Sequence, residues 1–166
     1  MLKAIIYTLL PTHDNLMYTS AILLAYFACM RSAEYCFDPL VSPPLLRSSL
    51  KFVLSSPPYV VVNVKSAKTS MKGYRAVVGC TGKPLCAYCA LLAYLNLTSG
   101  RPQGILFTLQ DGSPLTYKLL NGFLKKTLRR LGYDHSNYTP HSIRAGAATD
   151  AAIQGFSAPD SNVWED

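Results

Sequence analysis

The chain has 166 residues, of which 49% are hydrophobic and only 15% are charged. This composition supplies enough apolar side chains for one compact core and excludes a chain that is mostly disordered. The 16 lysines and arginines outnumber the nine acidic residues and give a net charge of +7. A basic chain of this kind is expected to bind a polyanion, with nucleic acid as the favoured partner.

Three further features concern the compartment. The longest apolar run, residues 21–30, is about half of the roughly 20 residues that a membrane-spanning helix needs, so we expect no membrane partner. The apolar start of the chain is not followed by a small-residue cleavage site, so we expect no secretion. Five cysteines are an odd number, which favours reduced thiols and an intracellular protein.

The first predicted element is a buried helix that begins at Asp14, a suitable N-cap, and ends with the apolar run at Met30. Arg31 follows directly, and Glu34 lies three residues further on. The helix would therefore deliver an arginine to its end, with a carboxylate close enough to hold it. A proline-rich loop then ends the helical region.

The middle of the chain predicts three strands, over residues 50–54, 59–64 and 74–78. Proline and glycine residues bound these strands, so we expect a small antiparallel sheet. Lys68 and Lys72 fall on or near the hairpin between the last two strands, and Arg75 falls on the last strand.

The remainder predicts helices over residues 87–97, 117–131 and 139–155, which makes the whole an α+β fold. The second of these helices, with Thr116 as N-cap, carries an apolar stripe and five basic residues without one acid: Lys118, Lys125, Lys126, Arg129 and Arg130.

The start of the last helix is the most informative segment. Thr139 is its predicted N-cap and Pro140 takes the first helical position, which places His141 and Arg144 on one face of the first turn. A guanidinium and an imidazole beside free backbone N–H groups suit a phosphate. Together with Arg31 and Lys68, they form a set of cations of the kind that phosphoryl transfer needs.

These segments, in this order, resemble the catalytic domain of the tyrosine recombinase (phage integrase) family. Arg31-Ser-Ala-Glu34 resembles the family's first box, Ser66-Ala-Lys-Thr69 its β-hairpin lysine segment, and His141-Ser-Ile-Arg144 its second box. The segment 106–115 is similar to the version carried by mobile elements, including retrotransposons, of the DIRS and Crypton type. The resemblance implies a mostly helical catalytic fold with a three-stranded antiparallel sheet over residues 14–156, between an N-terminal segment (1–13) and an unrelated acidic tail (157–166).

The resemblance also implies DNA recombination and integration by phosphoryl transfer on double-stranded DNA, with no metal or cofactor. Arg31 and Arg144 would clamp the scissile phosphate. His141 would act as acid/base, Lys68 would protonate the leaving 5′ oxygen, and Glu34 would support them. Backbone phosphates would be contacted by Lys72, Arg75, Lys118, Lys125, Lys126, Arg129 and Arg130. A eukaryotic mobile element would place the protein in the nucleus.

The sequence departs from the family pattern after the second box. The family continues with a further histidine or tryptophan and then the nucleophilic tyrosine, whereas the last tyrosine here is Tyr138 and the segment around Trp164 has no likeness to that region. We therefore expect a truncated catalytic domain that binds DNA and holds a phosphate without cleaving the strand. Family members assemble on DNA by exchanging a C-terminal segment. Such a segment would lie past residue 166, so the resemblance favours a monomer off DNA.

Two other functions stay open. A non-catalytic DNA-binding relic would use its basic surface alone, and its binding would fall steeply with salt. A zinc-binding domain would use Cys80, Cys86 and Cys89, with His135 or His141 as a distant fourth ligand. The second alternative is less favoured, since no second Cys-x-x-Cys pair completes a tetrahedral set.

Overall fold

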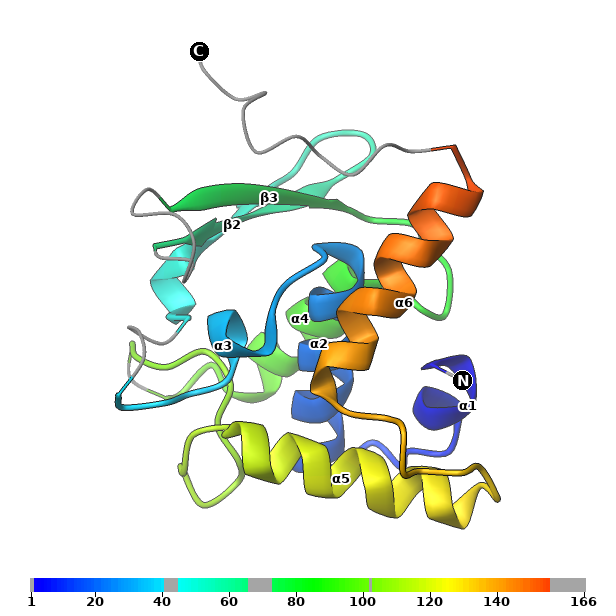
Figure 1. The fold of residues 1–166 in the computed structure, drawn as a ribbon. Helices are drawn as coiled ribbons and strands as arrows, with labels where there is room; N and C mark the ends of the chain where they lie inside the picture. Colours follow the sequence, from blue (N-terminus) through cyan, green and yellow to red (C-terminus); the bar gives the residue numbers. More distant parts are fainter. Residues whose placement is uncertain (1, 41–44, 66–72, 102, 156–166) are drawn as a thin grey trace.

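The computed structural model describes residues 2–40, 45–65, 73–101 and 103–155 (Figure 1). Helices come first, a three-stranded antiparallel sheet follows, and helices complete the chain, so the predicted α+β fold is confirmed. The sheet lies across one end of the helices, and α5 (Tyr117–Arg130) lies across the opposite end (Figure 1).

Helix α2 (His13–Phe27) is the centre of the core. Its buried residues run from Met17 to Ala25 and point in all directions, because the helix packs against both α4 (Ala87–Leu97) and α6 (Pro140–Ile153). The predicted N-cap, Asp14, is wrong: the Thr12 side chain accepts from the Asn15 N–H at 3.3 Å and caps the helix. The Asp14 carboxylate instead accepts from the Gln110 N–H at 2.7 Å.

The predicted extension of this helix to Met30 is also wrong. Helix α2 ends at Phe27, and Cys29 adopts a left-handed conformation with φ of 49°. Met30 is fully buried after this break, so the apolar run continues although the helix does not. Arg31 therefore stands at the N-cap of a separate short helix, α3 (Ser32–Tyr35), and not at the end of α2.

The sheet closes one side of the core. A single 3₁₀ turn, η1 (Arg47–Ser49), leads into β1 (Leu50–Val53), which pairs with β2 (Tyr59–Val64), and β2 pairs with β3 (Tyr74–Gly79). Every second residue of β2 is buried, as expected for a strand with one face on the core. Val64 pairs with Tyr74 across the hairpin. The predicted hairpin residues Lys68 and Lys72 lie outside the described residues.

The three later helices confirm their predicted positions to within two residues at each end. Thr116 caps α5 as predicted, since its side chain accepts from the Leu119 N–H at 3.3 Å. At the start of α6 the Thr139 N–H donates to the Ser142 hydroxyl at 3.1 Å. The Tyr26 hydroxyl donates to the Asp150 carboxylate and so joins α2 to α6.

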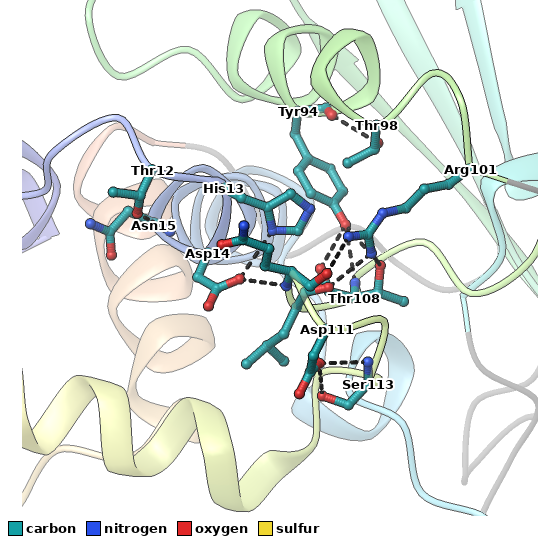
Figure 2. A network of polar contacts seen from close by, with 12 residues as sticks. Thr12, His13, Asp14, Asn15, Tyr94, Thr98, Arg101, Thr108, Asp111 and Ser113 are labelled. Carbon is teal, nitrogen blue, oxygen red and sulfur yellow. Dashed lines mark hydrogen bonds and ion pairs between the residues drawn. The ribbon is translucent and has the colours of Figure 1, made fainter.

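The connection between α4 and α5 is held by a polar network (Figure 2). The Tyr94 hydroxyl accepts from the Thr108 N–H at 3.0 Å, and the Arg101 guanidinium donates to the Thr108 hydroxyl at 2.9 Å and to the Gln110 carbonyl at 2.7 Å. The bond from Gln110 to Asp14 ties the same loop to the start of α2. These contacts fix where the chain enters α5.

The first residues also belong to the core. Residues 2–7 form helix α1 (Leu2–Tyr7), which the sequence interpretation did not include, and Ile5 is 1% exposed. The predicted division into segments 1–13, 14–156 and 157–166 stays a prediction, and the acidic tail lies outside the described residues. None of the helices described has the length and apolar character that crossing a bilayer requires.

Candidate functional site

The site is organised around the Glu34 carboxylate, whose side chain is 3% exposed. It accepts a hydrogen bond from the backbone N–H of Arg31 at 2.6 Å, which starts α3, and one from the Tyr74 hydroxyl of β3 at 2.8 Å. The Arg31 guanidinium lies 3.9 Å from the same carboxylate. One buried acid thus joins the break after α2, the short helix α3 and the edge of the sheet.

Arg144 acts on the same cluster through its charge. Burial and the Glu34 carboxylate raise the pKa of Tyr74 well above its usual range, while the positive charges of Arg144 and Arg31 act in the opposite direction. Both guanidinium groups therefore lie within electrostatic reach of the Tyr74 hydroxyl. The first and second predicted boxes, more than a hundred residues apart in the chain, meet at this point.

His141 completes the cluster. Its Nδ1 atom lies 3.4 Å from the hydroxyl of Ser32, the first residue of α3. The ring also contacts that of Tyr117, the first residue of α5, with 5.6 Å between ring centres and 42° between ring planes. His141 is exposed, so a ligand can reach its side chain.

The starts of α3, α5 and α6 therefore converge on His141. Since α5 and α6 have 14 residues each, their N-terminal N–H groups and dipoles favour an anion there. The end of α3 is tied to the entry of α5 by the Phe37 N–H, which donates to the Leu115 carbonyl at 2.7 Å. Two guanidinium groups, an imidazole and these helix starts can together hold a phosphate in a preorganised arrangement.

The predicted set is brought together only in part. Arg31, Glu34, His141 and Arg144 lie in one cluster, but Lys68 and Lys72 are outside the described residues. Arg75 is exposed on β3, and the alternation of a strand directs it to the face opposite Tyr74 and Glu34. A ligand that contacts both Arg75 and the cluster would have to pass around the edge of the sheet.

The basic residues of α5 form two rows and not one. Lys118, Lys125 and Arg129 are seven and eleven residues apart, close to two and three turns, and so share one row. The Arg129 guanidinium donates to His135 at 3.0 Å. Lys126 and Arg130 belong to the next row, where they line a hollow of about 360 Å³ together with Thr8, Leu9, Leu10, Asn15, Phe123, Thr127 and Leu131.

Three residues of the cluster were not predicted from the sequence. Tyr74 was assigned only as the start of a strand, Ser32 only as part of a motif, and Tyr117 only as the start of a helix. An inward-facing tyrosine on the predicted β3 was the one available signal, because a buried hydroxyl needs a partner. Ser32 and Tyr117 carry no such signal, since their proximity to His141 depends on how three helices meet.

The sequence and the structure of this chain were compared with those of known proteins. No family model and no curated protein matches the sequence. Among solved structures, the chain is similar to the XerH site-specific recombinase bound to its difH substrate in a pre-cleavage complex, with a TM-score of 0.67 and 19% identity over 92% of this chain and 40% of that one. It is similar also to XerH bound to a palindromic difH substrate in a post-cleavage complex, with a TM-score of 0.66 and 19% identity over 95% of this chain and 43% of that one.

The likeness covers nearly the whole chain and shows that it shares the α+β fold of the matched part of these site-specific recombinases. The predicted fold class is therefore confirmed. The chain spans less than half the length of the recombinases that it matches. At this level of identity the comparison establishes the fold, and the chemistry of the cluster has to be argued from its residues.

Proposed function

We propose that this chain binds double-stranded DNA and holds one backbone phosphate in the cluster of Arg31, His141 and Arg144. The observation that carries the proposal is the convergence of two arginines and a histidine, from opposite ends of the chain, around the buried Glu34 carboxylate and the start of α6. The structural neighbours are recombinases in complex with DNA substrates, which supports DNA as the partner.

The chemistry of the cluster suits a phosphodiester. Each guanidinium offers a planar fork of donors that matches two phosphate oxygens, and two such groups balance the charge that accumulates on the non-bridging oxygens during phosphoryl transfer. Glu34 acts as a positioning residue, because its buried carboxylate orients the Arg31 backbone and lies beside the Arg31 guanidinium. The Nδ1 atom of His141 faces Ser32, which leaves Nε2 as the ring atom that would serve hydrogen bonding or proton transfer.

The family resemblance extends the proposal to roles that need DNA in place. Arg31 and Arg144 would contact the non-bridging oxygens, and Lys68 would donate a proton to the leaving 5′ oxygen. Lys72, Arg75 and the basic residues of α5 would contact neighbouring phosphates and set the position of the duplex without reading bases.

We further propose that these residues alone bind without cleaving. No tyrosine follows Arg144 among the 166 residues. General acid and electrostatic groups cannot replace a nucleophile, so strand cleavage would need one supplied from elsewhere. The finer assignment is a DIRS or Crypton type catalytic domain of a mobile element, acting inside the cell and in the nucleus of a eukaryotic host.

The proposal is tested by titrating the protein onto a fluorescent duplex of mixed sequence and measuring anisotropy at several salt concentrations. Arg144→Ala is expected to weaken binding about 10- to 100-fold, because a hydrogen bond to a charged group contributes about 1.5–3 kcal/mol. Arg144→Lys keeps the charge but loses the fork and should recover only part of the affinity. Lys3→Ala removes one positive charge outside the cluster and serves as the control.

A second candidate is favoured by the exposure of Lys118, Lys126, Arg129 and Arg130 on α5. In that case the chain is a DNA-binding relic that uses its basic surface alone. Arg144→Ala and Lys3→Ala would then weaken binding equally, and the loss would disappear at high salt. That result would exclude a phosphate pocket.

A further inference from the structure

Three thiols gather away from the phosphate cluster, where β3 leads into α4. Cys80 directly follows β3, Cys86 is the N-cap of α4, and Cys89 lies in the first turn of that helix. The Cys80 and Cys89 sulfur atoms are 3.7 Å apart, those of Cys86 and Cys80 are 3.8 Å apart, and all three lie within 4.8 Å of one another. Cys86 is buried, whereas Cys89 is exposed.

These separations fit a shared metal ion. Three sulfur atoms at tetrahedral angles, each about 2.3 Å from Zn²⁺, are about 3.8 Å apart. A disulfide would bring two of them to about 2.05 Å, and all three cysteines are free thiols. The connection from Cys80 to Cys86 can turn back on itself because Gly82 adopts a positive φ of 63°.

The backbone is arranged to stabilise a thiolate. The N–H groups of Thr81 and Cys89 both donate to the Cys86 sulfur, at 3.4 and 3.5 Å. Burial by itself would raise the pKa of Cys86, but these N–H groups lower it to about 6. Burial and the hydrogen bonds to the two neighbouring sulfurs raise the pKa of Cys89 to about 12. Two backbone donors thus point at the Cys86 sulfur and favour the thiolate, which is the form that binds a metal.

We propose that Cys80, Cys86 and Cys89 bind one Zn²⁺ ion through their three sulfur atoms, with the fourth position taken by a water molecule. Binding releases the thiol protons to solvent and changes no oxidation state. Among the residues that the structure describes, no histidine or carboxylate joins the three sulfurs. The histidines that the zinc alternative considered as a fourth ligand have other neighbours: His135 accepts from Arg129, and His141 lies beside Ser32.

The ion would join the sheet to the helical core. Cys80 extends the strand that carries Tyr74, while Cys86 and Cys89 belong to α4, which packs against α2. A metal bridge at this point fixes β3 relative to the helices. This role does not depend on the proposed phosphate binding, because none of the three cysteines contacts that cluster.

The test is the metal content of the untagged 166-residue chain, purified with a reductant and without chelator. We expect about one equivalent of zinc by elemental analysis after gel filtration, and less than about 0.1 equivalent in Cys80→Ser and Cys89→Ser. Cys29→Ser alters a cysteine outside the cluster and should keep the full equivalent. Replacing zinc by Co²⁺ should give the visible absorption of a tetrahedral thiolate site, and Cys89→Ser should abolish it.

Two outcomes would overturn the proposal. The wild-type chain could contain no zinc and take up no Co²⁺ while all three thiols react with a thiol reagent, which would identify a packed group of thiols. Alternatively, metal-free protein could carry a disulfide between two of the three cysteines even after purification with reductant, which would identify a redox pair. The wild-type measurement decides between these results even if a variant fails to fold.

Discussion

Replacing Glu34 by alanine removes the acceptor around which the cluster is built. Two hydrogen bonds to a buried carboxylate are lost, at 2.6 Å from the Arg31 N–H and at 2.8 Å from the Tyr74 hydroxyl, and each contributes about 1.5–3 kcal/mol. The Arg31 guanidinium adds little, because its side chain is 38% exposed and screened by water. We expect Glu34→Ala to lower the free energy of unfolding by about 3–6 kcal/mol, a large part of the usual 5–15 kcal/mol.

The assay is urea unfolding at pH 7 followed by circular dichroism. Glu34→Gln keeps the shape and one acceptor oxygen, so it should cost less than Glu34→Ala and stay folded if alanine does not. The double variant of Glu34→Gln with Tyr74→Phe should be more stable than the two single losses predict, by about 0.5–3 kcal/mol. A loss below about 1 kcal/mol for Glu34→Ala, or additive losses in the double variant, would refute the organising role of Glu34.

Three further predictions concern the single residues Tyr74, Gly112 and Arg129. The fold raises the pKa of Tyr74 and so favours the neutral phenol, which means that the free energy of unfolding should fall as the pH rises above about 10. Tyr74→Phe should flatten this fall in urea titrations from about pH 8 to 11. Equal slopes for the variant and the wild type would contradict the prediction. Gly112 has a φ of 87°, so Gly112→Ala should lower the free energy of unfolding by about 1–2 kcal/mol in the same assay, whereas Gly104→Ala, at an open position without a positive φ, should not. Arg129→Ala should reduce the slope of log affinity against log salt for duplex DNA by about 1, and an unchanged slope would remove Arg129 from the interface.

Local signals account for most of the secondary structure. The valine-rich run of β2 and the capping residues Thr116 and Thr139 predict their elements closely, because strands and helix starts depend on neighbours in the chain. The break of the helix after Phe27 was missed because the prediction used only this local pattern. Apolar residues continue to Met30, and nothing in the local pattern shows that Cys29 turns into a left-handed conformation.

The candidate site was likewise predictable from the sequence only in part. The sequence by itself determined which residue types could hold a phosphate, since His141 and Arg144 share the first turn of a predicted helix and Arg31 directly follows the apolar run. Only the tertiary structure decided that Tyr74 bonds to Glu34 and that Ser32 and Tyr117 contact His141. Such contacts join segments far apart in the chain, and they depend on the packing of whole elements, which no short window of sequence contains.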